Sequence, residues 1–128
     1  MNKNLFHEIQ TKNTLYQDVI KEIGHQLKKD NTIKSHDNYF QEVLSREKDG
    51  NIEIFPEVIL PHIQSENILE TTIYLIKGKN DLIKWHNKPL KLIILLNLKP
   101  NEDPEVLIEI QTFMRNLAEE SYVETLIK

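Results

Sequence analysis

The stretch LKLIILLNL at residues 90–98 decides the fold of this 128-residue chain, because seven of its nine residues are apolar. A run of this length and composition is typical of a β-strand that is covered on both faces of a sheet. Lys91 and Asn97, its two polar residues, are expected to reach water at the strand ends. A strand buried on both faces needs a layer of helices on each side, so the stretch predicts the central strand of an α/β protein.

Further strands are expected upstream of this central strand. Val58, Ile59 and Leu60 form an apolar run that Pro61 ends, because proline cannot donate a hydrogen bond to the ladder. The other candidates alternate in polarity or are rich in β-branched residues, and they are the segments 5–9, 52–54 and 71–76. These runs predict the remaining strands of the sheet.

The first helix is expected after residue 14. Thr14 and Gln17 have the spacing of a capping box, which marks the start of a helix. The apolar side chains that follow recur every four residues and predict one buried helix face, formed by Leu15, Val19, Ile23 and Leu27.

Three more helices are expected from capping signals. Asp49 and Gly50 form the stop signal of the second helix. The start signals are Ser35 or Asp37 for the second helix, Asp103 with Pro104 for the third, and Glu120 or Ser121 for the last. Helices on both sides of the strand-rich segments predict the fold class: an α/β sandwich with a central mixed β-sheet flanked by helices. The length fits a single domain, residues 1–128.

Composition excludes several function classes. The net charge is -4 and the lysines are scattered, so direct nucleic-acid binding is not expected. The chain has no cysteine, which removes disulfides, thiolate metal sites and cysteine nucleophiles and suits a reducing cytosol. No apolar run approaches the roughly 18 residues that span a bilayer, so we expect a cytoplasmic protein without membrane insertion.

Five histidines, at positions 7, 25, 36, 62 and 86, are the chain's candidates for chemistry. None has the spacing to another ligand that metal sites show, so neither a metal nor another cofactor is expected. His25 lies on the polar side of the first helix and His36 in a polar turn, and both are expected to be surface residues without a role.

His62 differs from the other histidines in its setting. Pro61 holds Leu60 extended and interrupts the strand, so His62 is expected just beyond the strand end, where α/β folds place reactive groups. A neutral imidazole there, with one nitrogen oriented by a hydrogen bond and the other facing solvent, is a competent nucleophile toward phosphorus. The residues alone leave this reading open beside that of an ordinary loop histidine.

Four segments resemble a known family. YFQEVLSREKDG at residues 39–50, followed without a gap in spacing by VILPH at 58–62, is similar to the EIIA domain of the sugar phosphotransferase system, fructose/mannitol type. IKW at 83–85 leading into the apolar run resembles the family's tryptophan-containing loop before its central strand. EESYVETL at 119–126 resembles the acidic pair and helix that end the domain.

The resemblance implies a function and a set of site residues. His62 would accept a phosphoryl group from the carrier protein HPr and pass it to an EIIB domain during sugar uptake, through small and transient contacts. Arg46 would help neutralise the phosphoryl oxygens; a charge at the end of a helix is the other reading of this residue. Gln64 is the second phosphate-stabilising residue, at a position where the family commonly has a basic side chain.

The resemblance also leaves alternatives open. Only Gly50 remains of the family's glycine-rich turn, and Val106 stands where some members have a second histidine. A carrier, which would be the phosphotransferase component of an enzyme system, is the leading hypothesis, but these departures count against efficient transfer more than against the fold. They fit an EIIA-like regulatory domain of a sugar-responsive transcriptional regulator or antiterminator, with His62 as phosphorylation sensor. A binding module without phosphoryl chemistry is the third hypothesis. Phe55, Val58 and Ile63 are candidates for an apolar rim that docks partners, and the alternative for each of them is a place in the core.

Overall fold

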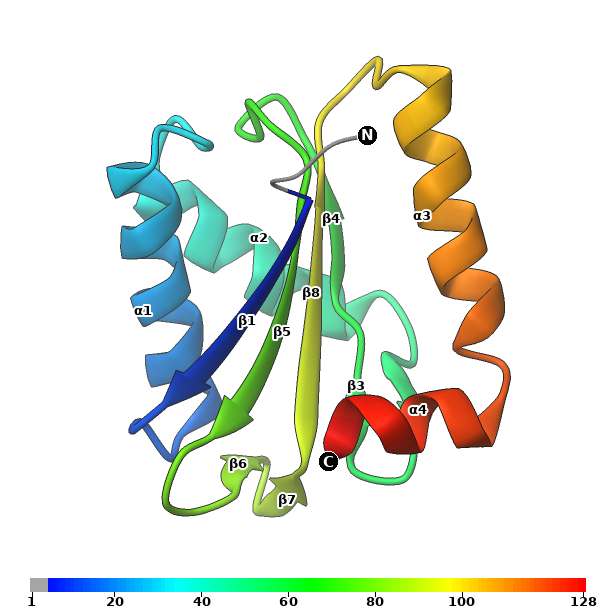
Figure 1. Ribbon diagram of the computed structural model, residues 1–128. Coiled ribbons are helices and arrows are strands. Elements are labelled where there is room, and N and C mark those ends of the chain that lie inside the picture. The colour runs from blue at the N-terminus through cyan, green and yellow to red at the C-terminus, as the bar shows by residue number, and fades with distance from the viewer. Residues whose placement is uncertain (1–4) are drawn as a thin grey trace.

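A computed structural model describes residues 5–128. Its central strand is β8 (Leu92–Leu98), and all seven of its residues are buried. Strand β5 (Thr72–Gly78) runs antiparallel to β8, and β1 (Phe6–Thr11) runs parallel to β5 at the edge of the sheet (Figure 1). This half of the sheet confirms the central position predicted for the apolar run.

The other half of the sheet is built from three short strands. Strands β3 (Val58–Ile59) and β4 (His62–Gln64) both lie parallel to β8, and β2 (Glu53–Phe55) runs antiparallel to β3. The sheet is therefore mixed, as predicted. A separate two-stranded sheet is formed by β6 (Ile83–Trp85) and β7 (Lys88–Leu90), so Trp85 ends a strand and does not lie in a loop.

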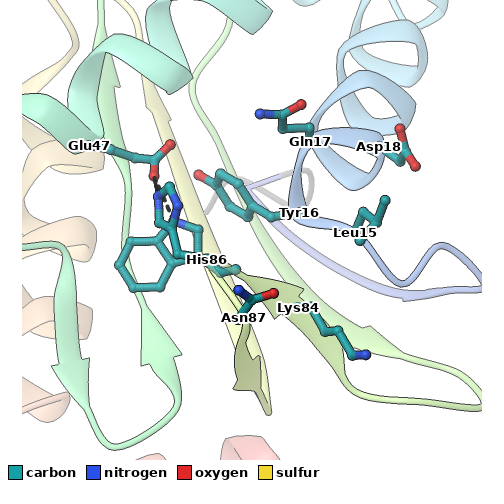
Figure 2. Close-up of a pocket in the computed structure, with 9 residues that line it drawn as sticks. Leu15, Tyr16, Gln17, Asp18, Glu47, Lys84, His86 and Asn87 are labelled. Atoms are coloured by element: carbon teal, nitrogen blue, oxygen red, sulfur yellow. Dashed lines mark hydrogen bonds and ion pairs between the residues drawn. The ribbon is translucent and has the colours of Figure 1, made fainter.

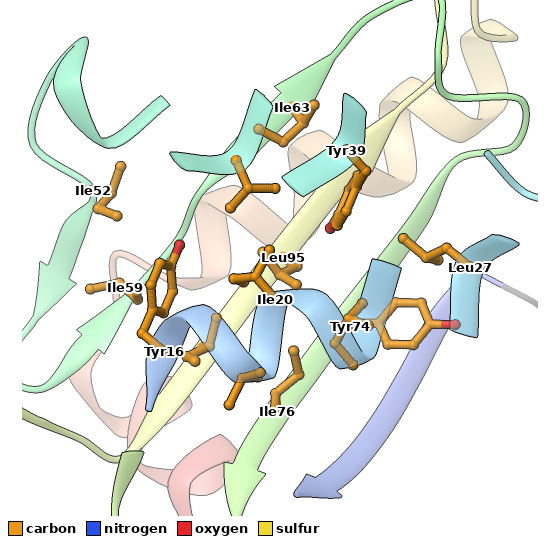
Figure 3. Close-up of a cluster of buried hydrophobic side chains, with 14 of the residues drawn as sticks. Tyr16, Ile20, Leu27, Tyr39, Ile52, Ile59, Ile63, Tyr74, Ile76 and Leu95 are labelled. Carbon is orange, nitrogen blue, oxygen red and sulfur yellow. The ribbon is translucent and has the colours of Figure 1, made fainter. Parts of the chain in front are cut away.

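Helices cover both faces of the sheet, which confirms the predicted sandwich (Figure 1). Helices α1 (Tyr16–Lys29) and α2 (His36–Lys48) lie on one face, and α3 (Pro104–Asn116) and α4 (Glu120–Ile127) lie on the other. The larger of the two cores packs α1 and α2 on the sheet (Figure 3). Every β8 side chain from Leu92 to Leu96 belongs to one core or the other, which explains the continuous apolar run.

The helix starts confirm most of the capping signals. Ser35 caps α2 by accepting a hydrogen bond from the Asn38 backbone, and Asp103 stands at the N-cap of α3. The capping box at Thr14 is wrong: Leu15 is the N-cap of α1, its side chain is 53% exposed, and no side chain caps this end. The spacing alone misplaced the start because Tyr16, not Leu15, begins the buried face.

Asn97 corrects the expectation that both polar residues of the central run reach water. Its side chain is fully buried, where its Oδ1 accepts from the Tyr39 hydroxyl at 2.8 Å and its Nδ2 donates to Thr72 at 3.2 Å. A buried amide is tolerated when its donors and acceptor find partners. Lys91 is exposed, as predicted.

Pro61 interrupts the strand, as predicted: β3 ends at Ile59, and Leu60 and Pro61 lie between β3 and β4. The Pro61 carbonyl accepts from the Leu96 backbone N–H at 3.1 Å, so the N–H that proline lacks is on the side of β8 and the ladder is broken there. Pairing resumes at His62 in the same register, with Val58 opposite Leu92 and His62 opposite Leu96. His62 therefore lies just past the end of β3 and begins the short strand β4.

Candidate functional site

An open cavity of about 410 Å³ lies between α2 and β4. The last two turns of α2 supply Ser45 and Arg46 to its wall, and β4 supplies His62 and Gln64. The structure thus brings together the three residues that the sequence singled out, Arg46, His62 and Gln64, although Arg46 and His62 are 16 positions apart in the sequence. They meet because β4 lies at the edge of the sheet beside α2.

His62 has the protonation state of a nucleophile. Burial lowers the pKa of its imidazole, and the nearby positive charge of Arg46 lowers the pKa further. A histidine with a depressed pKa is neutral at pH 7 and keeps a lone pair on one ring nitrogen. Its Nε2 is buried and has no hydrogen-bond partner within residues 5–128, so the orienting bond expected at one nitrogen is not found there.

Arg46 is placed in the last turn of α2. No carboxylate of the described residues forms an ion pair with it, so its guanidinium is not committed to a protein anion. The helix dipole also favours a cation at this position. The two interpretations of Arg46, as a partner of phosphoryl oxygens and as a charge at the helix end, are therefore compatible. A guanidinium beside a neutral imidazole can accept phosphate oxygens in its planar fork.

Gln64 lies two residues after His62 on β4, so the two side chains leave the strand on the same side. Its side chain is exposed and lines the cavity. An amide offers two N–H donors but no charge. Its contribution to anion binding is therefore weaker than that of a basic residue.

Sequence reasoning missed the carboxylates of this cavity. Glu42 and Asp49 also line it, and Oε1 of Glu42 is buried without a hydrogen-bond partner in the described chain. Glu42 lies one helical turn before Arg46, so the i, i+4 spacing was the available signal. With one arginine and two carboxylates, the formal charge of the lining is negative, which opposes a phosphoryl group.

The docking rim expected from the sequence is wrong for two of its three residues. Val58 is fully buried and Ile63 is 4% exposed, and they belong to the cores on opposite faces of the sheet. Phe55 is half-buried and packs against the α3–α4 core. Ile54, which precedes Phe55 on β2, is 41% exposed and is an apolar side chain that this strand presents to solvent.

The other histidines take structural positions. His7 stacks on Tyr74 with ring centres 4.6 Å apart, and the rings of His25 and His36 lie 4.3 Å apart. His86 lies 2.9 Å from Glu47. Within residues 5–128, no three His, Cys, Asp or Glu side chains are grouped as metal ligands, and no helix there has the length and apolar character that crossing a bilayer requires.

The fold and this histidine-containing cavity define a class: α/β sandwiches in which a mixed sheet lies between two pairs of helices, the architecture of phosphotransferase EIIA domains. The family model described as phosphoenolpyruvate-dependent sugar phosphotransferase system, EIIA 2, matches residues 3–128. The chain therefore belongs to the EIIA type 2 family of the sugar phosphotransferase system.

Solved structures support the fold. Nitrogen regulatory protein IIA-Ntr from Neisseria meningitidis superposes with a TM-score of 0.69 at 20% identity, covering 98% of this chain and 85% of that chain. The mannitol-specific cryptic phosphotransferase enzyme IIA CmtB from Escherichia coli gives 0.64 at 24% identity, covering 98% and 84%. Enzyme IIAMTL of Escherichia coli, solved in complex with phosphorylated enzyme IIBMTL, gives 0.55 at 18% identity, covering 99% and 96%. The comparison with curated proteins found no match.

Proposed function

We propose that His62 accepts a phosphoryl group from HPr and passes it to an EIIB domain in the cytoplasm, as the phosphocarrier of a sugar uptake system. The observation that carries the proposal is the half-buried, neutral His62 in a cavity that it shares with Arg46, in a chain of the EIIA type 2 family. The histidine fits the role because its lone pair is available at neutral pH.

The transfer step follows from this protonation state. One ring nitrogen of His62 attacks phosphorus through its lone pair, while the other nitrogen keeps its proton. The bond from phosphorus to the donor nitrogen breaks in line as the new bond to His62 forms, and the reverse geometry returns the group to the next acceptor. The protein's part is to position the ring and stabilise the phosphoryl charge, and no metal or cofactor is required by this step.

Arg46 and Gln64 stabilise the phosphoryl oxygens in this proposal. Arg46 supplies the positive charge and Gln64 supplies neutral N–H donors on the same side of β4 as His62. Glu42 and Asp49 oppose the charge, so the phosphorylated state is held weakly. A weakly held group suits a carrier, because it must leave again.

An EIIB domain is the proposed acceptor. Enzyme IIAMTL, which shares this fold, has been solved in complex with phosphorylated enzyme IIBMTL. The cavity lies at a sheet edge, where β4 pairs with β8 alone among the strands of residues 5–128, so a partner can approach His62 without unfolding any of these elements. Contacts with HPr and with EIIB are expected to be small and transient, since one partner must leave before the next can bind.

The test is phosphorylation with purified components. Incubation with phosphoenolpyruvate, Enzyme I and HPr should add one acid-labile phosphoryl group, detected by intact mass. The group should be absent from His62→Gln, whereas the control variant His25→Gln, on the exposed side of α1, should be labelled as the wild type is. If the wild type gains no mass, or if His62→Gln is labelled equally, the proposal fails.

The regulatory alternative differs in the fate of the phosphoryl group. Adding a cognate EIIB domain to the phosphorylated protein should discharge His62 if the chain is a carrier. If His62 is phosphorylated but retains the group in the presence of EIIB, the domain acts as a phosphorylation sensor instead.

A further inference from the structure

A second cavity, of about 300 Å³, lies between the start of α1, the end of α2 and the β6–β7 hairpin (Figure 2). Tyr16, Glu47 and Trp85 line it, one from each of these elements. It shares no lining residue with the cavity around His62. It is therefore a candidate site with its own lining, although Glu47 also fastens the end of α2, which carries Arg46.

Tyr16 leaves a polar atom unpaired in this cavity. The residue is 3% exposed, and its hydroxyl oxygen is buried without a hydrogen-bond partner in the part of the chain that the structure describes. Burial and the charge of Glu47 raise the pKa of Tyr16, so the hydroxyl stays protonated. Figure 2 shows its hydroxyl end turned toward Glu47 and His86. A buried hydroxyl normally finds a partner, so the atom is free for a molecule in the cavity.

Glu47 adds a carboxylate without a lysine or arginine partner among the described ion pairs. Its side chain is 14% exposed, and Oε1 accepts from Trp85 Nε1 at 2.6 Å and lies 2.9 Å from His86 Nε2. His86 is itself 73% exposed at the side chain and so neutralises the carboxylate only when protonated. Buried carboxylates are usually paired with a cation. The cavity thus offers a negative charge that the protein does not balance.

The hairpin turn that carries His86 is held in an uncommon backbone conformation. His86 and Asn87 have φ of 51° and 66°, both in the left-handed region. Two consecutive positive φ values form the tight turn that closes β6 and β7. Asparagine and histidine are both enriched in this region, so the turn fixes the position of His86 beside Glu47 without unusual strain.

Aromatic rings form the apolar side of the cavity. The rings of Tyr16 and Trp85 lie 6.4 Å apart at 60° to each other. Both ring types attract cations over their faces. The other charges of the lining are Asp18, which adds a second carboxylate, and Lys84, which Figure 2 shows directed away from Glu47.

We propose that this cavity binds an organic cation, with an alkylammonium or guanidinium group against the Glu47 carboxylate and the Tyr16 hydroxyl and its carbon chain along Trp85. An anion would meet two carboxylates, and a neutral ligand would leave the charge of Glu47 unbalanced. A metal ion lacks ligands, since no group of three suitable side chains occurs within residues 5–128. The cation can come from a free amine or from a lysine or arginine side chain of a peptide.

Trp85 is the only tryptophan of the chain, so its fluorescence reports this cavity directly. The full chain is titrated with n-butylammonium chloride and n-butylguanidinium chloride, and with sodium chloride and 1-butanol as controls for ionic strength and for the apolar chain. At least one of the two organic cations should change the emission saturably, and neither control should. If neither cation gives a saturable change, the proposal is overturned and water is the only occupant. If 1-butanol gives an equal response, the proposal also fails, because the site is then an apolar cavity without preference for a cation.

Three variants test the contacts. Glu47→Gln keeps an oxygen for Trp85 and His86 but removes the charge, and it should weaken cation binding by about tenfold or more. Tyr16→Phe removes only the unpaired oxygen and should weaken binding while the melting temperature is kept or raised. Glu124→Gln, exposed on α4, should bind as the wild type does. Unchanged binding by Glu47→Gln, in a variant that still melts cooperatively, contradicts the proposal.

Capped amino acids distinguish the two sources of the cation. N-acetyl-lysine N-methylamide and N-acetyl-arginine N-methylamide carry the same cationic groups on a peptide backbone. Binding of either at least as tightly as the butyl compounds supports a peptide side chain as the occupant. Binding of the butyl compounds alone supports a free amine.

Discussion

Replacing Tyr39 by phenylalanine should destabilise the protein through one hydrogen bond that joins α2 to the central strand. The Tyr39 side chain is fully buried, and its hydroxyl donates to Oδ1 of Asn97 at 2.8 Å. Phenylalanine keeps the ring and leaves Oδ1 buried without a partner. An unsatisfied buried polar atom costs about 1–3 kcal/mol, so the free energy of unfolding should fall by that amount.

The size of the effect can be measured by urea unfolding followed by far-ultraviolet circular dichroism. In urea, the unfolding free energy should fall while the m-value stays the same. In a thermal melt, a loss of 1 kcal/mol lowers the melting temperature of a domain of this length by about 3–5 °C. The melting temperature of Tyr39→Phe should therefore fall by about 3–15 °C. Tyr16→Phe is a matched control, because Tyr16 is also a buried tyrosine on a helix but its hydroxyl has no partner in the described chain. This variant should be as stable as the wild type or more so.

The comparison of the two variants can refute the reasoning. If Tyr16→Phe lowers the stability as much as Tyr39→Phe does, the loss comes from ring packing or solvation and not from the hydrogen bond. If Tyr39→Phe is neutral while Asn97→Leu is strongly destabilising, the amide of Asn97 finds another partner. A further readout concerns the site, since Tyr39 holds the helix that carries Arg46, and Tyr39→Phe should also slow phosphorylation of His62.

Three more predictions concern the His62 cavity. Arg46→Ala should slow phosphorylation by HPr by about tenfold or more, because a charged partner of the phosphoryl oxygens is lost. A cooperative melt should show that the fold is retained. An unchanged rate would mean that Arg46 is only a charge at the helix end. Gln64→Lys should raise the phosphorylated fraction at equilibrium by roughly two- to fivefold, which is the effect expected of a partly exposed charge. Intact mass gives this fraction. A decrease would mean that residue 64 lies away from the phosphate. The phosphorylation rate should rise with pH as His62 loses its proton, with a midpoint below the usual histidine pKa of 6.5, because burial and Arg46 lower the pKa of His62. In Arg46→Ala this rise should move to higher pH. If the rise does not move, Arg46 is not a cause of the lowered pKa.

The same pKa shift gives the pH dependence of stability a sign. Below pH 6.5 His62 is protonated in the unfolded chain, whereas in the folded chain its lowered pKa keeps it neutral until the pH is lower. The unfolded state therefore binds more protons in this pH range. Folding stability at this residue therefore falls as the pH falls from 6.5 through the lowered pKa, and is unaffected above it. In His62→Gln this loss should disappear from the pH profile of the unfolding free energy.

The periodicity of apolar residues was enough to predict the layers of the fold, but it did not predict which polar side chains are buried. The run at residues 90–98 predicted a strand covered on both faces, and the structure confirms it in β8. Asn97 was misplaced because a polar residue near the end of an apolar run is expected at the surface. Only its partner Tyr39, 58 residues away in sequence, makes burial favourable, and no local pattern contains that information.

Pro61 shows what one residue can predict. Proline breaks the ladder, and β3 ends before it, as the sequence indicated. The sequence did not show that pairing with β8 resumes at His62 in the same register, because that depends on a partner strand far away along the chain. His62 therefore begins a short strand at the edge of the sheet, where a partner can approach it.

Arg46 and Glu47 are neighbours in the last turn of α2 but make different contacts. Neighbouring residues on a helix diverge by about 100° around the axis, so adjacent positions at the end of α2 face different surroundings. Arg46 lines the cavity of His62, whereas Glu47 accepts from Trp85 and fastens the helix end to the β6–β7 hairpin. The two neighbouring residues therefore make different contacts, and that of Glu47, to which the sequence assigned no role, fixes the helix end from which Arg46 reaches His62. Glu47→Ala should accordingly slow phosphorylation even though its side chain does not line the His62 cavity, and restoration of the rate by Glu47→Gln would assign the effect to the hydrogen bond and not to the charge.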